Sequence, residues 1–353
     1  MNLLRRFTFS ALLLLCLGLA ASAAQPKVRG GNVMPPALRP GDRIAIVEPA
    51  YRLDSLKIAQ AAGLIESWGF EPVIGENVGG SWNGCYSGTP QERAADLNRA
   101  LEDDSIKAIL CTRGGYGAIH LLPLVDMLLL KAHPKWIIGY SDITTLHSMA
   151  VCSGVMSLHG VMCGSLASGE GRDISAQLLR EIITGQALPQ YIVPAHPCNI
   201  EGEARGTLVG GNICTFDPLY GSGQDFLEGD DLILFIEEVG EHLHRLDRLF
   251  NSLMLRGVLG RCRGVILGDF EDCPPKDEDP AEGDVMAASV EELYSKYLQP
   301  LGIPLCCGLH SGHGDDNFPL IMGAPVLLQV SAEGSRITFC PKQDSPRHIF
   351  YTD

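Results

Sequence analysis

The stretch Lys135-Trp-Ile-Ile-Gly-Tyr-Ser141-Asp142-Ile-Thr-Thr-Leu-His-Ser-Met-Ala150 decides the fold of this chain. An apolar run reaches a glycine, continues through Ser141, and becomes a helix within two residues. This order is typical of a nucleophile elbow, in which a sharp strand-to-helix turn lifts one hydroxyl above a parallel sheet. The start of the helix offers free backbone N–H groups and a partial positive charge, which stabilise a developing oxyanion. The stretch therefore predicts an α/β fold with Ser141 as a candidate nucleophile.

A serine in such a turn also has a plain structural explanation, because serines near helix starts are commonly N-caps. The turn also lacks the glycine that hydrolase elbows carry two residues after the serine. Catalysis needs a base and an acid from elsewhere in the chain. His313, in Ser311-Gly-His-Gly-Asp-Asp-Asn317, is a candidate base, and Glu237 or Glu238, at the end of an apolar run, is a candidate acid. The nucleophile, acid and base would then follow one another along the chain in the order Ser, Glu, His, each at a strand end or in an adjoining loop.

The first half of the chain alternates between strand and helix patterns. The sequence Thr89-Pro-Gln-Glu92 is a capping box with proline at the first helical position. Repeated strand–helix units predict a parallel sheet with helices on both faces and ligands at the carboxyl ends of its strands. Gly114 and Ser141 both fall on that edge. The predicted elements are strands at 42–49, 71–78 and 107–112 and before Ser141, and helices at 53–68 and 89–103.

After a polar connector the pattern changes to a mixed domain with more β pairing. We expect a tight glycine-rich turn at 206–212 and a long amphipathic helix from Leu243 to Leu255. Further strands are predicted at 231–236 and 264–268, with a closing hairpin at 326–330 and 336–339. The acidic loop 269–284 is expected to be a solvated surface excursion rather than a metal site. The predicted boundaries are an N-terminal domain at 40–175, a linker at 176–200 and a C-terminal domain at 201–345.

Composition restricts the possible partners. The 353 residues carry a formal net charge of −15, with 46% hydrophobic and 20% charged residues. Binding of nucleic acid needs clustered Lys and Arg, so nucleic acid is not an expected partner. An anionic substrate would need a local basic pocket set against this overall negative charge.

The N-terminus has the pattern of an export signal. Arg5 and Arg6 precede an apolar core at 11–20, and Ala21-Ser22-Ala23 is a small-residue cleavage site. The apolar run is too short to span a bilayer comfortably, so a cleaved signal is favoured over a membrane anchor. We therefore expect a signal peptide at 1–24, cut near Ala23, and an exported, periplasmic protein without stable membrane insertion after cleavage.

The ordered motifs of this chain resemble the serine LD-carboxypeptidase family, which includes murein-recycling carboxypeptidases and the microcin C self-immunity peptidase. The resemblance covers roughly residues 40 to 341. It departs from the family at Val161, where members often have proline after His-Gly. The motifs are Arg39-Pro-Gly-Asp42, Gly88-Thr89, Glu92-Arg-Ala-Ala-Asp-Leu-Asn98, Arg113-Gly-Gly-Tyr-Gly117, Gly139-Tyr-Ser-Asp-Ile-Thr144, Gly206-x-Leu-x-Gly-Gly-Asn212, Glu237 with Arg245-x-Asp-Arg248, and Gly312-His313 with Asn317.

The resemblance implies a Rossmann-like N-terminal domain, a smaller β-rich C-terminal domain, and a Ser-Glu-His triad between them. Carried over by motif, Ser141 is the nucleophile, Glu237 the orienting acid and His313 the general base, with no metal and no cofactor. Glu237 is preferred over Glu238 because the family's glutamate directly follows the apolar strand.

A carboxypeptidase also needs groups that bind its substrate. We expect the backbone amides of Asp142 and of Gly114 or Gly115 to be oxyanion donors. Binding of the free terminal carboxylate of the substrate favours a positively charged side chain in a fixed position. Arg113 is the candidate because it directly precedes the glycines, although a structural salt bridge is an equal alternative for it.

The family resemblance implies hydrolysis of the L,D-amide bond that releases the terminal D-alanine from murein tetrapeptides, by a homodimer. Two alternatives stay open. One is a related serine amidase that cleaves peptide- or acyl-nucleotides. The other is a periplasmic binding protein that holds muropeptides without cleaving them.

Overall fold

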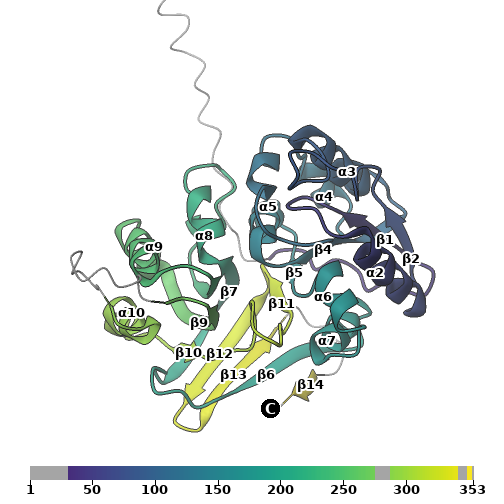
Figure 1. Ribbon diagram of the computed structural model, residues 1–353. Coiled ribbons are helices and arrows are strands. Elements are labelled where there is room, and N and C mark those ends of the chain that lie inside the picture. Colours follow the sequence, from purple (N-terminus) through teal and green to yellow (C-terminus); the bar gives the residue numbers. More distant parts are fainter. Residues whose placement is uncertain (1–30, 275–286, 341–347, 352–353) are drawn as a thin grey trace, which may run out of the picture.

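The computed structural model describes residues 31–274 and 287–340, together with the backbone of residues 348–351. The chain is built around two sheets, each with its own helices (Figure 1). The predicted signal peptide, residues 1–24, lies outside the described residues, as does most of the acidic loop. No helix in the described part of the chain has the length and apolar character needed to cross a bilayer.

The first sheet has the strand order β11-β5-β4-β3-β1-β2. Its neighbouring strands run parallel except for β11, which pairs antiparallel with β5. This arrangement confirms the predicted parallel sheet and places the carboxyl ends of β3 and β4 side by side. The strands are β1 (Arg43–Val47), β2 (Glu71–Ile74), β3 (Ile106–Cys111), β4 (Trp136–Gly139), β5 (Ser157–His159) and β11 (Leu320–Met322).

Helices cover both faces of the first sheet because its central strands are apolar on both sides. In β1, Ile44 and Ile46 belong to one buried cluster while Ala45 and Val47 belong to the other. The first cluster includes buried residues of α2 (Ser55–Ser67), α6 (Cys163–Ser168) and α7 (Ile174–Ile183). The second includes those of α3 (Pro90–Glu102), α4 (Leu128–Ala132) and α5 (Thr144–Cys152).

The predicted capping box fixes the start of α3. The Thr89 hydroxyl accepts the Glu92 N–H at 3.3 Å, and the Glu92 carboxylate accepts the Thr89 N–H at 2.8 Å. Two backbone donors that a helix start leaves unpaired are thereby satisfied.

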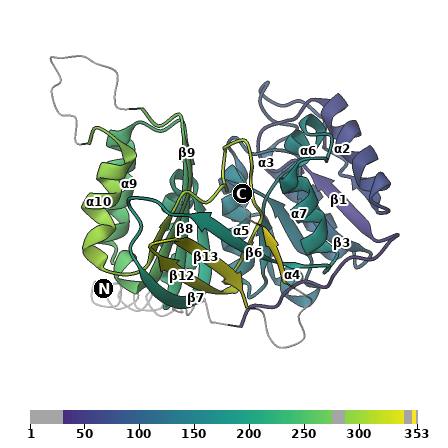
Figure 2. The same cartoon turned by 90° about the horizontal axis from the view of Figure 1, so that it is seen from below.

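The second sheet is mixed, as expected, and has the order β10-β9-β8-β7-β12-β13-β6-β14. Figure 2 shows α9 and α10 on its outer side, away from the first sheet. Its strands are β6 (Leu188–Pro194), β7 (Gly202–Asn212), β8 (Leu232–Val239), β9 (Cys262–Glu271), β10 (Leu305–Cys307), β12 (Pro325–Ser331), β13 (Gly334–Phe339) and β14 (His348–Tyr351). Its helices include α8 (Ile213–Phe216), α9 (Leu243–Leu255) and α10 (Val290–Tyr297).

The expected glycine-rich turn at 206–212 is wrong, because these residues form the second part of β7. The glycines are needed because the backbone of β7 lies very close to neighbouring elements, and not because the chain reverses direction here. A Cβ on Gly210 would overlap the carbonyl oxygen of Phe235, and one on Gly211 would lie 2.6 Å from the Thr144 hydroxyl oxygen. Only glycine lets β7 lie so near β8 and the start of α5.

The segment 176–200, which the sequence predicts to be a linker, contains regular secondary structure. It holds most of α7, whose Leu178, Leu179 and Ile182 are buried, and the whole of β6, which pairs with β13 and β14. Apolar spacing inside a Gly- and Pro-containing stretch was enough to anchor both elements.

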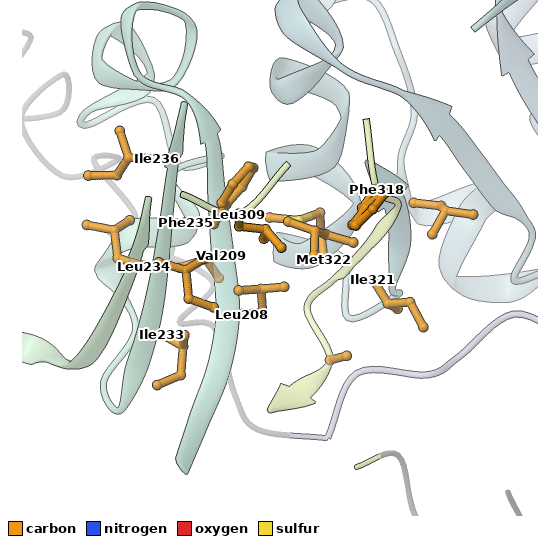
Figure 3. Packing of buried hydrophobic residues seen from close by; sticks show 14 of the residues in the cluster. Leu208, Val209, Ile233, Leu234, Phe235, Ile236, Leu309, Phe318, Ile321 and Met322 are labelled. Carbon is orange, nitrogen blue, oxygen red and sulfur yellow. The ribbon is translucent and has the colours of Figure 1, made fainter. Parts of the chain in front are cut away.

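Apolar packing joins the two sheets into one core. Leu208 and Phe235, from the second sheet, and Met322 of β11 are all fully buried, and they lie in the same cluster (Figure 3). The backbone also connects the sheets, because the Gly323 N–H donates to the Leu208 carbonyl at 2.7 Å. The carboxyl edge of the first sheet is therefore held in a fixed position against β7 and β8.

Candidate active site

Ser141 occupies a strained turn at the end of β4. Tyr140 is still extended, Ser141 has φ +63°, and a 3-10 turn, η2 (Ser141–Ile143), leads into α5. A left-handed conformation costs a non-glycine residue about 1–2 kcal/mol, so the surrounding packing must enforce it. Gly139 permits this packing, because a Cβ there would lie 2.9 Å from the Ile143 side chain. The structure therefore has the elbow geometry that the sequence predicts.

The glycine loop, Arg113–Gly117, lies directly against the elbow. A Cβ on Gly114 would be 2.8 Å from the Ser141 Cβ, 3.0 Å from its Oγ and 3.3 Å from the Asp142 backbone nitrogen. Gly115 has φ +111°, which side-chain-bearing residues rarely adopt. The backbone of this loop therefore lies so close to Ser141 and Asp142 that a side chain at position 114 would have no room.

The Asp142 side chain ties the elbow to the far end of the glycine loop. Its carboxylate is buried and accepts the Ala118 N–H at 2.7 Å. Burial raises the pKa of Asp142 to about 6, although the Ala118 N–H and the Arg93 charge act in the opposite direction. Arg93, itself buried, donates to the Gly117 carbonyl at 3.2 Å and so supports the same loop.

His313 and Glu237 meet in a short hydrogen bond contributed by the second domain. Glu237 is fully buried at the end of β8, and its Oε2 lies 2.6 Å from the His313 Nδ1. His313 sits in the loop between β10 and β11. Burial acts to lower the pKa of His313, but the hydrogen bond and charge of Glu237 outweigh it, and the pKa is raised. This pair has the contact of an orienting acid and its base.

Glu238 has a different set of partners. Its carboxylate accepts the Asn212 side-chain amide at 2.7 Å, the Cys214 N–H at 2.9 Å and its neighbour Val239 N–H at 2.9 Å. Successive residues of a strand point to opposite faces, so only one of the two glutamates can face His313. The structure brings Glu237 to His313 and leaves Glu238 to hold the start of α8.

Three residues that the sequence analysis did not single out also surround His313. The Tyr140 ring meets the His313 ring edge-on at 5.0 Å between centroids. The Asp269 carboxylate accepts the Gly314 N–H at 3.1 Å. Asn317, noted only as part of a motif, accepts the Gly312 N–H at 3.1 Å. Asp269 lies near the end of β9, and the rule that ligands gather at strand ends would have found it.

A cavity of about 500 Å³ opens onto Ser141 and His313. It brings together Arg113, Gly114 and Gly115 with the two reactive side chains, while Glu237 lies behind His313. Arg113 forms no ion pair with any described residue; its guanidinium carbon lies 5.9 Å from the centre of the Tyr51 ring. The remaining lining residues are Leu53, Lys57, Thr112, Tyr140, Met162, Gly164, Ser165 and Ser168.

The other nucleophile and ligand types of the chain do not assemble a competing site in the part that the structure describes. Residues 31–274 and 287–340 contain no group of three His, Cys, Asp or Glu side chains placed to hold a metal ion. The eleven described cysteines are free thiols. Burial raises the pKa of Cys111 and of Cys163, so these thiols stay protonated at neutral pH.

Comparison with known proteins places this geometry in a family. Residues 44–160 match the LD-carboxypeptidase N-terminal domain, and residues 205–328 match the LD-carboxypeptidase C-terminal domain. The chain is 30% identical over 307 residues to the murein tetrapeptide carboxypeptidase of Pseudomonas aeruginosa, covering 84% of this chain and 94% of that protein. It is 27% identical over 306 residues to the microcin C7 self-immunity protein of Escherichia coli, covering 76% and 84% of the two chains.

A solved structure agrees with the fold. The crystal structure of muramoyltetrapeptide carboxypeptidase from Oxalobacter formigenes superimposes with a TM-score of 0.73 at 25% identity, covering 86% of this chain and all of that one. The expected α/β architecture and the expected family are both confirmed. This chain belongs to the LD-carboxypeptidase family of serine hydrolases.

Proposed function

We propose that this protein is a serine carboxypeptidase that removes the terminal D-alanine from murein tetrapeptides. Ser141 acts as nucleophile, His313 as general base and Glu237 as the acid that orients His313. The observation that carries the proposal is the 2.6 Å contact between His313 and Glu237 beside a cavity that also exposes Ser141. The names of the Pseudomonas and Oxalobacter relatives support murein peptides as the substrate class.

The first chemical step is acylation of Ser141. Because the Nδ1 of His313 is engaged by Glu237, its Nε2 is available to take the Ser141 proton. The freed oxygen attacks the carbonyl carbon of the L,D-amide bond. Glu237 stabilises the imidazolium that forms, in a site where burial strengthens their attraction. The ester bond to Ser141 forms as the C–N bond breaks, and His313 returns the proton to the departing D-alanine nitrogen.

The glycine loop supplies stabilisation for the negative oxygen of the tetrahedral intermediate. The Asp142 N–H and an N–H of Gly114 or Gly115 are the proposed donors. Their close approach to Ser141 is fixed before substrate arrives, which is the condition for effective stabilisation. Water then attacks the ester, again with His313 as base, and regenerates the Ser141 hydroxyl.

Arg113 is the residue proposed to bind the terminal carboxylate of the substrate. In a carboxypeptidase only one residue follows the scissile bond, so that carboxylate must lie close to the nucleophile. Arg113 directly precedes Gly114, lines the same cavity and forms no ion pair with a described residue. Its planar guanidinium can bind both carboxylate oxygens.

A related amidase activity is the second candidate. The likeness to the microcin C7 self-immunity protein favours it, and the substrate would then be a peptide- or acyl-nucleotide.

Export to the periplasm and assembly as a homodimer also belong to the proposal. Cell fractionation with detection of the cut near Ala23 tests the first, and light scattering of the purified protein tests the second.

The direct test is mass spectrometry of the protein incubated with L-Ala-γ-D-Glu-diaminopimelate-D-Ala. We expect loss of one D-alanine by the wild type and a rate lower by on the order of 10⁶ for Ser141→Ala. Equal cleavage by both proteins would contradict the assignment of Ser141. Absence of cleavage by folded wild-type protein would contradict the substrate, and peptide-nucleotides would then be assayed.

A further inference from the structure

A second cation lines the cavity and has no part in the proposed mechanism. Lys57 belongs to α2, and its Nζ donates to the Ser168 hydroxyl of α6 at 3.3 Å. The two helices pack against each other, so Lys57 and Ser168 lie on neighbouring elements. Lys57, Ser165 and Ser168 therefore form a polar wall on a different pair of elements from the Arg113 loop.

The charge of the cavity is opposite to that of the chain. Among the described residues that line it are Lys57, Arg113 and His313, but no Asp or Glu. The whole chain has 42 acidic and 27 basic residues. Lys57, like Arg113, forms no ion pair with a described residue. A pocket built this way offers two separate positive positions, Arg113 in the glycine loop and Lys57 on α2.

A murein tetrapeptide carries carboxylates at more than one position, which gives each cation a separate partner. The terminal carboxylate belongs to the leaving residue and fits Arg113, as argued above. The residue before the scissile bond is the next nearest to Ser141, and in diaminopimelate its side chain ends in an amine and a carboxylate. Lysine at that position has the same amine without the carboxylate, so the two residues differ in the group that a cation would bind.

We propose that Lys57, together with the Ser168 hydroxyl, binds the side-chain carboxylate of the residue that precedes the scissile bond, and so makes the enzyme prefer diaminopimelate over lysine there. This inference rests on the proposed function and specifies its substrate. It makes Lys57 a specificity-determining residue, because it contacts substrate away from the reacting atoms. The hydroxyl of Ser168 holds the amine in place when no substrate is bound.

The test compares two tetrapeptides that differ only in diaminopimelate or lysine at the third position. We expect kcat/KM of the wild type to favour the diaminopimelate peptide. In Lys57→Gln the ratio of the two kcat/KM values should fall about tenfold, which corresponds to the loss of one charge-assisted hydrogen bond. The loss should appear as a higher KM for the diaminopimelate peptide. Lys57→Arg is the matched control and should retain most of the preference. Equal losses on both peptides, or an unchanged ratio, would overturn the proposal.

Binding to an inactive enzyme separates this inference from the proposed function. Calorimetry with Ser141→Ala, with and without Lys57→Gln, measures affinity for the same peptides without hydrolysis. Tighter binding of the diaminopimelate peptide that depends on Lys57 would support the site even if the wild type released no D-alanine. Equal affinity of both peptides for the Ser141→Ala protein would overturn it even in an active enzyme. Unchanged melting of Lys57→Gln checks that this exposed substitution leaves the fold intact.

Discussion

The two halves of the proposed active site are built by different means. On the edge of the first sheet, Ser141 is held by backbone geometry, with φ +63° and glycines at 114 and 139 that leave no room for a side chain. In the second domain, a hydrogen bond to the Glu237 carboxylate positions His313. The Asp269 carboxylate binds the N–H of the neighbouring Gly314. The nucleophile side should therefore be sensitive to added atoms, and the base side to removal of charge without change of shape.

Removal of charge from Glu237 is expected to have the largest effect on the base side. Glu237→Gln keeps the shape of the side chain but leaves His313 without its charged partner, so kcat should fall by about 10⁴. Glu238→Gln is the matched control one residue away, and it should reduce melting temperature rather than rate, because Glu238 binds the backbone of Cys214 and Val239. Rates of D-alanine release and thermal melts measure both. A greater rate loss in Glu238→Gln would exchange the two assignments.

An added methyl group is the corresponding test on the nucleophile side. Gly114→Ala places a Cβ 2.8 Å from the Ser141 Cβ and should displace the loop that carries an oxyanion donor. We expect kcat to fall by about 10²–10³, the effect of losing one such donor. Gly63→Ala is the control, because its Cβ would contact nothing within 4 Å in the middle of α2. This control should be stabilised by up to about 1 kcal/mol with normal activity. Full activity of Gly114→Ala would show that loop geometry is not critical.

Asp269 should make a smaller contribution, visible in the pH profile. His313 must be neutral to act as base, so kcat/KM falls as pH drops through its pKa, which the nearby carboxylates raise above about 6.5. Other titratable neighbours of His313 are Glu238, His159 and Tyr140.

Asp269→Asn keeps an acceptor for the Gly314 N–H but removes the charge. Its acid limb should therefore move to lower pH by on the order of half a unit. Asp269→Ala removes both the charge and the acceptor, and should lower kcat in addition. A profile of Asp269→Asn that coincides with the wild type would assign Asp269 a purely structural role.

The parts that could be predicted from the sequence are those that local chemistry determines. The elbow at Ser141 and the capping box at Thr89 depend on residues within a few positions of one another. The pairing of His313 with Glu237 is non-local, and it was expected only because the family resemblance supplied it. Local patterns did not distinguish Glu237 from Glu238, whose roles depend on which face of β8 each occupies.

The errors arose where distant contacts give ordinary residues a special task. Gly210 and Gly211 have the composition of a turn, but they allow β7 to approach Phe235 and Thr144. The three-residue strand β11 joins the first sheet although its chain neighbours join the second, and so short an element has no distinctive pattern. Asp269 was assigned to a solvated acidic loop although it directly follows the predicted strand 264–268; its position at a strand end was the available signal, whereas its contact with Gly314 is non-local.

The most direct test of the account is a double-mutant cycle across the two domains. Ser141→Ala, His313→Ala and the double variant would be compared for D-alanine release and for melting temperature. If the two halves act as one catalytic unit, the second substitution removes nothing further, and the double variant should be as active as the slower single variant. Rate losses that multiply would show that Ser141 and His313 act independently, and would contradict a triad assembled between the two sheets.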